Sequence, residues 1–344
     1  MSNVLFIYAG MHEAHKPFVE AVNADVYPAY RSNANGFRRF IEAFRMAKEY
    51  PNYDVYLLEG GMPMFPVYIK KKMRKDITVI GLLADETFIN LVERQPHYSF
   101  AETLIHRISV RCLDGAISVS PMVKEYAEKI IDVPIEIARP PISKENFVKL
   151  SKVKPDLESN VVISVGQPRY SIGMDILAEQ FKLVKKEYPE LELWIVGKGH
   201  PKEYEKVDGV KVLGYVEDLS EVFEEASLFV HAGRCSAYPV ATLEAMRAGL
   251  PVVVSTMTGT KEIVEKIETQ IKTEFNLNYD SNKFIQPLDR VFEGIVEYYK
   301  LDIEVRERLS ELYKKESEEF ELGKKKREFR EVFERLVERI RMIR

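Results

Sequence analysis

The sequence is poor in the features that mark several large classes of protein. It has two cysteines in 344 residues, Cys112 and Cys235, and their spacing fits no metal-binding motif. So few thiols are typical of a reducing compartment rather than of a disulfide-stapled secreted domain. No uninterrupted apolar run reaches membrane-spanning length, and the first ten residues lack the basic stretch of a signal peptide. We therefore expect a cytoplasmic protein.

The chain also lacks a strong charge of either sign. Its formal net charge is −4, which gives no overall reason to expect binding to nucleic acid. Hydrophobic residues make up 46% of the sequence, an ordinary share for a globular protein. A length of 344 residues is long for a single core, so two domains are expected.

Three phosphate-binding or catalytic signatures are absent. No G-x-x-x-x-G-K-[ST] occurs, no G-x-G-x-x-G follows the first expected strand, and G-x-S-x-G is missing. These absences argue against an ordinary NTPase, a dinucleotide site and a serine nucleophile elbow. His12 and His15 follow the first strand closely and could be metal ligands or a polar clamp. Without a third ligand nearby we favour the structural interpretation and expect no metal site.

Strands and helices alternate along the first part of the chain. The expected strands span 4–8, 54–58, 77–83, 115–119 and 135–137, and the expected helices 37–49, 101–113 and 122–131. Regular alternation of this kind predicts a parallel sheet covered by helices. The polar stretch 143–160 then reads as a linker.

A second alternating series follows that stretch. Its expected strands span 161–165, 191–196, 210–213, 228–231 and 252–254, and its helices 174–187, 219–225, 241–248 and 261–266, with amphipathic helices over 288–301, 303–322 and 326–343. The predicted class is α/β, with a Rossmann-like domain over 1–145, a second over 146–325 and a C-terminal helix over 326–344. Two such domains in tandem usually bind a ligand in the cleft between them.

The stretch 228–255 is the most informative part of the second series. It reads as buried strand, loop, short helix and buried strand, with Pro239 fitting the first helical turn and Gly249 ending the helix. A loop that enters a helix at the carboxyl end of a parallel strand is a common ligand site, because helix N-termini attract phosphates. Glu244 lies within that helix. From the pattern alone, its carboxylate is as consistent with a solvated or structurally paired group as with a ligand contact.

Glycine follows several expected strands of the second series directly. Gly166, Gly197 and Gly214 permit tight turns and close backbone approach at the strand ends. Three basic residues in neighbouring loops could converge on a diphosphate, although each is also consistent with a solvated loop cation. They are Arg169, Lys198 and Arg234.

A basic run, Lys70–Lys75, lies in the first domain beside Phe65 and Tyr68. Five of its six residues are cationic. Such a run could lie on an anionic membrane surface, and it could equally be the solvated face of a helix.

Five segments between residues 165 and 262 keep a recognisable order and spacing. They are Val165–Gln167 with Gly173–Leu177, Ile195–Gly199, Leu213–Leu219, Ser236–Val253 and Gly259–Glu262. Together they resemble the motifs of the retaining glycosyltransferases of family 4, which share the two-domain GT-B fold. The resemblance implies two Rossmann-like domains with a central cleft and a C-terminal helix that crosses back to the first domain.

The resemblance also implies a function and roles for individual residues. A UDP- or GDP-sugar would bind mainly to the second domain. A glycan or lipid-linked acceptor would bind to the first domain, at Gly10 and His12. Glu244 would bind the donor ribose, and Tyr215 and Val216 would contact the base through their backbone. The full set implied for the donor is Gly166, Gln167, Arg169, Gly197, Lys198, Tyr215, Val216, Arg234, Tyr238 and Glu244. Transfer would retain the anomeric configuration, with the donor phosphate accepting the acceptor's proton and with no cofactor or metal.

The chain departs from the family pattern at several of these positions. Ser236 stands where the family has the first acidic residue of E-x7-E, and Gln167 and Ile172 align with two basic residues. A strand-end histidine of many members aligns with Ala84, beside Asp85, so Asp85 and Ser236 are the candidate catalytic residues. Three functions remain open: an active transferase, an inactive GT-B binding or scaffold protein, and a nucleotide-sugar epimerase. Peripheral contact with the inner face of a membrane is compatible with the basic run.

Overall fold

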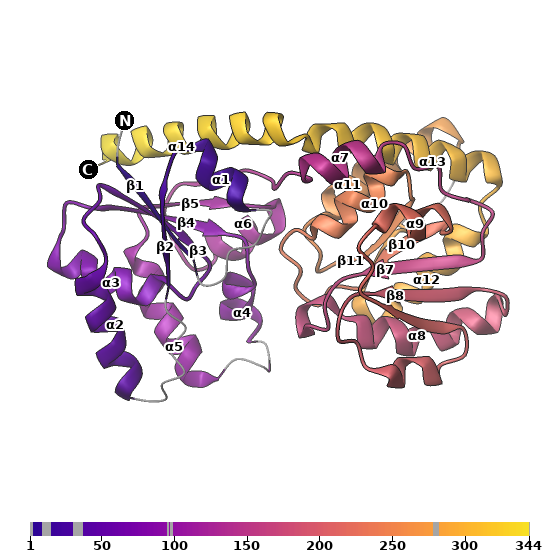
Figure 1. The fold of residues 1–344 in the computed structure, drawn as a ribbon, viewed down its shortest axis with the longest axis horizontal. Helices are drawn as coiled ribbons and strands as arrows, with labels where there is room; N and C mark the ends of the chain where they lie inside the picture. The colour runs from indigo at the N-terminus through magenta and orange to yellow at the C-terminus, as the bar shows by residue number, and fades with distance from the viewer. Residues whose placement is uncertain are drawn as a thin grey trace. The chain divides into compact units, whose positions relative to one another are not determined.

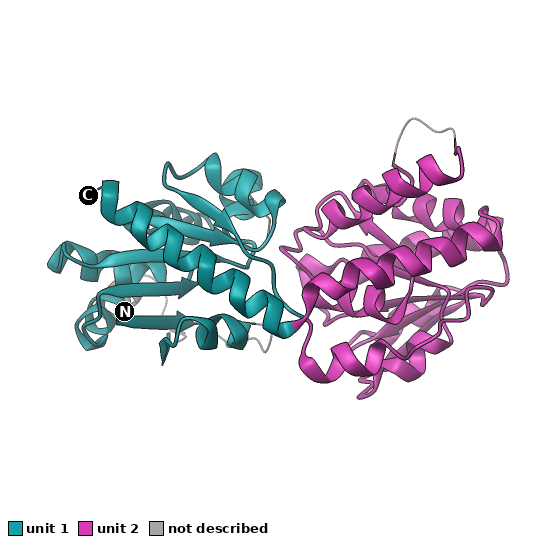
Figure 2. Cartoon of the chain, turned by 90° about the horizontal axis from the view of Figure 1, so that it is seen from above, with its two compact units in different colours: residues 1–141, 322–344 teal, residues 142–321 magenta. Residues whose placement is uncertain are grey.

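The computed structural model describes residues 3–8, 15–29, 37–94, 96, 99–277 and 282–343. The chain forms two compact units (Figure 2): unit 1 comprises Met1–Pro141 and Leu322–Arg344, and unit 2 comprises Ile142–Glu321. Each unit contains one six-stranded sheet in which all observed pairings are parallel, with helices against the sheet. The predicted α/β class with two Rossmann-like units is confirmed.

The sheet of unit 1 has the order β2-β1-β3-β4-β5-β6. Its strands are β1 (Val4–Tyr8), β2 (Asp25–Pro28), β3 (Val55–Glu59), β4 (Thr78–Leu83), β5 (Gly115–Ser118) and β6 (Ile135–Ile137). The central strand β4 is buried along its whole length, as a parallel strand covered on both faces should be. The edge strand β2 was not predicted, because its four residues are mostly exposed and carry no apolar run.

Helices cover both faces of this sheet. They are α1 (Lys16–Ala21), α2 (Phe37–Glu49), α3 (Met64–Met73), α4 (Thr87–Glu93), α5 (Phe100–Ser109), α6 (Pro121–Glu128) and α14 (Leu322–Ile343). Right-handed crossovers that run from β2 towards β6 put the connecting helices on one face, and only the β1-to-β2 crossover puts a helix, α1, on the other. Figure 1 shows α1 and α14 together on that second face, with α2, α3 and α5 opposite them.

The C-terminal helix α14 completes unit 1 by covering the face that the crossovers leave bare. Its buried side chains recur at helical spacing and form one apolar stripe: Phe329, Val332, Phe333, Leu336, Val337 and Ile340. Phe329 stacks on Phe18 of α1 with 4.3 Å between ring centroids. Lys326 pairs with Glu20 at 2.8 Å, and Arg330 donates to the Ala21 carbonyl at 2.7 Å. The predicted return of the C-terminal helix to the first domain is thereby confirmed.

The sheet of unit 2 has the order β12-β11-β10-β7-β8-β9. Its strands are β7 (Val161–Val165), β8 (Glu192–Val196), β9 (Val210–Gly214), β10 (Leu228–His231), β11 (Val252–Ser255) and β12 (Ile285–Gln286). β10 pairs with β7, and Phe229 lies opposite Ile163. Only the two-residue edge strand β12 was not predicted, because it is too short to leave a pattern.

Seven α-helices are described in unit 2. They are α7 (Lys144–Leu150), α8 (Met174–Glu187), α9 (Leu219–Glu224), α10 (Val240–Ala248), α11 (Lys261–Glu274), α12 (Val291–Tyr299) and α13 (Ile303–Glu316). The interpretation of 143–160 as a linker was wrong, because α7 forms there and packs on α10. Ser143 caps α7 by accepting from the Asn146 amide, and Leu150 at its end is buried. The short apolar spacing of this helix is hidden among charged residues in the sequence.

The basic run of the first domain is mostly engaged in contacts within unit 1. Lys70 is buried and donates to the Ala47 and Tyr50 carbonyls, and burial lowers the pKa of its ammonium group. Lys71 pairs with Asp114 at 2.6 Å, and Arg74 pairs with Asp76 at 2.6 Å. These contacts favour the structural interpretation of the run over a membrane-binding one.

Within the ranges of the chain described above, no helix combines the length and the apolar character needed to cross a membrane.

The packing of α14 on α1 leads to a stability prediction. Phe329→Ala should destabilise unit 1 by about 3–5 kcal/mol, because it removes a fully buried ring and leaves a cavity. Urea unfolding followed by far-UV circular dichroism measures the effect. Glu338→Ala, on the exposed side of the same helix, is the matched control and should change stability by less than about 0.5 kcal/mol. Equal midpoints for Phe329→Ala and the native protein would contradict the assigned packing.

Candidate functional site

The strand order of unit 2 defines where a ligand should bind. The chain runs from β7 outward through β8 to β9 and then returns to place β10 on the other side of β7. Ligands of open α/β sheets bind outside the carboxyl ends of the strands at such a reversal. The loops that flank it, 166–173 after β7 and 232–239 after β10, carry half of the predicted donor-binding residues.

Backbone hydrogen bonds link these strand-end loops into a continuous row, which we call the strand-end rim. The Gly197 amide donates to the Gly214 carbonyl at 2.7 Å, and the Gly166 amide donates to Val196 at 3.0 Å. On the other side of β7, the Arg234 amide donates to the Ser171 carbonyl at 2.9 Å. The rim therefore brings the loops after β7, β8, β9 and β10 together.

Two glycines of the rim have no possible substitute in this geometry. Gly173 has φ +74°, and a Cβ placed there would lie 1.9 Å from the Ala232 carbonyl oxygen. Gly197 has φ +149°, and its Cβ would lie 1.8 Å from the Gly166 carbonyl oxygen. Both loops approach a neighbouring carbonyl so closely that any side chain would push the rim apart.

The three candidate cations of the rim differ in what they contact. Arg234 makes a two-point contact with Asp175, at 2.8 and 2.6 Å, and lies 4.4 Å over the Tyr170 ring. The Arg234 contact lowers the pKa of the Asp175 carboxyl. Arg234 thus ties the loop after β10 to Tyr170 in the loop after β7 and to Asp175 at the start of α8. Arg169 and Lys198 are exposed and have no side-chain hydrogen bond or ion pair within the described residues, so both remain available to an anion.

Ser236 lies in a buried polar pair rather than at the surface. Its hydroxyl lies 2.8 Å from His231 Nε2 and 3.2 Å from the Ser171 carbonyl oxygen. When the hydroxyl donates to that carbonyl, His231 carries its proton on Nε2 and donates to Ser236 Oγ. His231 Nδ1 is then a bare acceptor, and no partner for it lies among the described residues. Burial lowers the pKa of His231 to about 4, so the pair is neutral at pH 7.

The remaining donor-side positions surround the start of α10. Pro239 is the N-cap of this helix rather than a first-turn residue, and no side chain caps the helix. The Val240 and Ala241 amides are therefore open to an anionic ligand, whereas the Thr242 amide donates to the Pro239 carbonyl at 3.2 Å. Tyr238 is buried and donates to Glu262 at 3.2 Å. Tyr215 is 73% exposed in the loop after β9, next to half-buried Val216, and Gln167 is exposed after β7.

Glu244 sits one turn into α10 and is half-buried. One of its oxygens accepts a hydrogen bond from the Asn146 side-chain amide of α7 at 2.6 Å. Burial raises the pKa of the Glu244 carboxyl, and the Asn146 hydrogen bond opposes that rise. Asn146 was missed from the sequence because it lies in the stretch interpreted as a linker. The Ser143 cap signal before it could have identified the helix.

The corresponding reversal in unit 1 lies between β1 and β3. Glu59, at the end of β3, forms a close hydrogen bond with Nδ1 of His15, which precedes α1. Asp85 accepts from the Gly61 amide at 3.1 Å and from the Thr87 hydroxyl at 2.9 Å, so it fastens the loop after β3 to the start of α4. Gly10 and His12, the predicted acceptor-side residues, lie outside the described residues.

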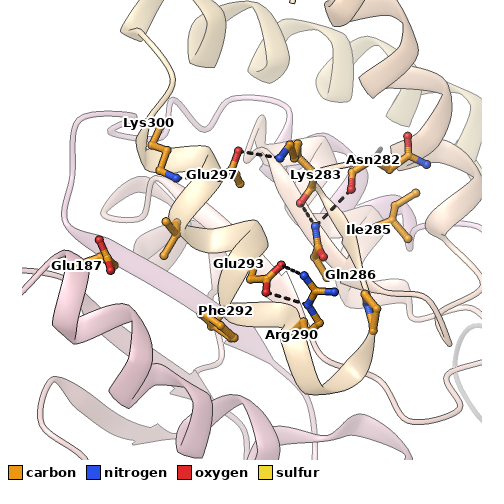
Figure 3. A pocket seen from close by; sticks show the side chains of 12 residues that line it. Glu187, Asn282, Lys283, Ile285, Gln286, Arg290, Phe292, Glu293, Glu297 and Lys300 are labelled. Carbon is orange, nitrogen blue, oxygen red and sulfur yellow. Dashed lines mark hydrogen bonds and ion pairs between the residues drawn. The ribbon is translucent and has the colours of Figure 1, made fainter. Parts of the chain in front are cut away.

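Unit 2 also has a cavity of about 540 Å³ that contains none of the predicted residues. It lies along α12 and β12 (Figure 3), where its charged side chains pair with one another. Arg290 bonds Glu293 through two contacts, and Glu297 contacts both Lys283 and Lys300. Because its charges are mutually neutralised, this cavity is a weaker candidate for an anionic ligand than the rim. Among the residues described, no group of three or more His, Cys, Asp or Glu side chains could hold a metal ion.

Comparison with known proteins gives the following matches. Residues 159–293 match the family described as "Glycosyl transferases group 1". An uncharacterized glycosyltransferase from Haemophilus influenzae is 30% identical over 129 residues, which cover 35% of this chain and 36% of that protein. The match thus spans about a third of the curated relative.

Solved structures match over almost the whole chain. The sucrose-phosphate synthase of Thermosynechococcus elongatus superposes with a TM-score of 0.69 at 12% identity, over 97% of this chain and 99% of that one. HepE of Anabaena, solved in complex with UDP and glucose, gives a TM-score of 0.66 at 14% identity, over 97% and 100%. At these identities the likeness is evidence for the shared fold.

The buried pair of His231 and Ser236 leads to a pH-dependence prediction. A histidine with a pKa of 6.5 unfolded and about 4 folded contributes stability above pH 6.5 that is lost as the pH falls towards 4. The loss amounts to roughly 3 kcal/mol over that range. His231→Gln, which keeps a side-chain N–H donor but does not titrate, should flatten this part of the curve in urea unfolding monitored by Trp194 fluorescence. Parallel curves for the two proteins between pH 6.5 and 4 would refute the assignment.

Proposed function

We propose that this chain, whose residues 159–293 match the group 1 glycosyltransferases, transfers a sugar from a UDP- or GDP-sugar to a glycan or lipid-linked acceptor. The observation that carries the proposal is the set of groups at the reversal of unit 2. An uncapped helix start, two free cations and a carboxylate with one open oxygen lie on loops and helices that leave the strands there. These groups match the diphosphate and the ribose of such a donor in chemistry.

Each group has a distinct part in the proposed reaction. Glu244 accepts a hydrogen bond from a ribose hydroxyl and fixes the donor's orientation. The first amides of α10, with Arg169 and Lys198, bind the diphosphate and stabilise the charge that grows on it as the bond to the sugar breaks. The neutral pair of Ser236 and His231 leaves the rim without a carboxylate there that would repel that charge.

The sugar transfer itself proceeds with retention. The acceptor hydroxyl attacks from the face that the nucleoside diphosphate leaves, and a leaving phosphate oxygen takes the hydroxyl proton. No protein nucleophile is required by this scheme. Exposed Tyr215 and half-buried Val216, in the loop after β9, would contact the base through their backbone.

A second candidate function is nucleotide-sugar binding without transfer. The observation that favours it is Ser236, whose hydroxyl is engaged by His231 and Ser171 and carries no charge to bind the donor's sugar. A donor panel of UDP- and GDP-sugars, assayed for nucleotide release with and without oligosaccharide or lipid-linked acceptors, separates the two. Product that contains the transferred sugar supports the transferase, and tight donor binding without release supports the binding protein. Absence of both binding and release across the panel rejects the proposed function.

Glu244 provides the first direct test of the site. Glu244→Ala should weaken binding of UDP or GDP by about 10- to 100-fold, because a hydrogen bond to a charged group is worth about 1.5–3 kcal/mol. Isothermal titration calorimetry measures the change. Glu265→Ala, an exposed carboxylate on α11, is the control and should bind the nucleotide as the native protein does. Native affinity in Glu244→Ala would remove this residue from the site.

Arg169 tests the diphosphate end separately. Arg169→Ala should weaken UDP binding by about tenfold and leave uridine binding unchanged, because the guanidinium contacts only phosphate oxygens. Competition against a fluorescent nucleotide compares the two ligands. Lys186→Ala, which removes an exposed cation of α8 away from the rim, serves as the control. An equal loss for UDP and uridine would argue against a phosphate contact.

A further inference from the structure

Helix α7 bonds to two separate parts of the proposed nucleotide subsite. Asn146 donates to Glu244 of α10 at 2.6 Å. One turn later, Lys149 pairs at 2.6 Å with Asp218, the N-cap of α9 that ends the loop after β9. The two contacts therefore reach the carboxylate proposed for the ribose and the loop proposed for the base.

The backbone of α7 is held firmly at the point where Asn146 projects. The backbone amide of Asn146 donates to the hydroxyl of Ser143, the N-cap of α7, at 3.1 Å. The Arg247 guanidinium lies over the ring of the neighbouring Phe147, 4.0 Å from the ring centroid. The Arg247 Nε also donates to the Phe147 carbonyl oxygen at 3.0 Å. The Arg247 contacts hold α7 against α10, and neither they nor the Ser143 cap use the Asn146 side chain.

Within the described residues Glu244 is the one partner of the Asn146 side-chain amide, and the bond leaves half of the carboxylate free. Oε1 accepts from Asn146, while Oε2 has no hydrogen-bond partner in the described chain. The side chain is half-buried rather than fully buried, and Oε2 retains some exposure to solvent. A half-buried carboxylate that is anchored at one oxygen and open at the other presents a single directed acceptor.

We propose that Asn146 is a positioning residue for nucleotide binding, which holds one oxygen of Glu244 so that the other accepts a hydrogen bond from a ribose hydroxyl. The inference rests on the proposed function, because it needs a nucleotide at the rim. It adds that α7, outside the segment 159–293, helps to determine selectivity for the ribose. The amide acts through Glu244 and does not itself touch the reacting atoms.

The experiment compares UDP with 2′,3′-dideoxy-UDP, which lacks both ribose hydroxyls, by isothermal titration calorimetry on the full chain. The GDP pair is run in parallel, and the nucleotide that binds is used. The native protein should prefer the ribonucleotide. Asn146→Ala should weaken the ribonucleotide about tenfold and the dideoxy form less than twofold, so that the preference is lost. Asn146→Asp, which keeps the shape but replaces the donor with a second carboxylate, should lose the preference as well.

Two controls separate positioning from packing. Val148→Ala, on the exposed side of α7, should leave both affinities unchanged. Adding Asn146→Ala to Glu244→Ala should have no further effect, because the amide acts only through that carboxylate. Circular dichroism establishes that each variant is folded.

Other outcomes overturn the inference in distinguishable ways. An equal loss for both nucleotides in Asn146→Ala means a purely structural role for the amide. Unchanged preference in Asn146→Ala, or no preference in the native protein, rejects the inference and leaves the proposed function standing. If the native protein binds neither nucleotide of either pair, the proposed function fails together with the inference.

Discussion

The pairing of β7 with β10 is the constraint on which the candidate site depends. These strands lie 66 positions apart at Val162 and Leu228, and their parallel register brings the loops at 166–173 and 232–239 to one edge. Gly173 then meets the Ala232 carbonyl, Arg234 reaches Asp175, and Ser236 reaches Ser171. These contacts join the loop after β10 to the loop after β7 and to the start of α8. A shift of one residue in the register would disrupt each of them, because alternate residues of a strand face opposite sides of the sheet.

Sequence patterns predicted the strands that are buried on both faces of a sheet well, and predicted edge strands and short surface helices poorly. The strands covered on both faces were found because they are continuous apolar runs, as in β4 and β10. The edge strand β2 and the helix α7 were missed because their stabilising contacts come from elsewhere in the chain. Helix α7 is fixed largely by Arg247, a residue 100 positions from Phe147. A local sequence pattern cannot predict a contact with a residue so far away in the chain.

The candidate site was predictable to a similar degree. Motif spacing identified Glu244 and the strand-end glycines, since these positions follow from the backbone path of strand, turn and helix. It could not distinguish the three rim cations, because only the folded chain shows that Asp175 engages Arg234 while Arg169 and Lys198 stay free. It also could not show that Ser236 faces a neutral histidine inside the unit. These contacts join side chains that are far apart in the sequence, and local sequence patterns do not predict them.

The covering of unit 1 by α14 has a consequence for biosynthesis. Residues 4–141 leave the ribosome first, but the helix that covers their second sheet face follows only after all of residues 142–321. At usual rates of translation this delay is roughly 10–40 seconds, much longer than helices and hairpins take to form. During that interval the apolar surface that later receives Phe329, Leu336 and Ile340 has no partner from its own chain. The first unit to be started is therefore the last to be finished, and the nascent protein is most prone to aggregation while the second unit is being made.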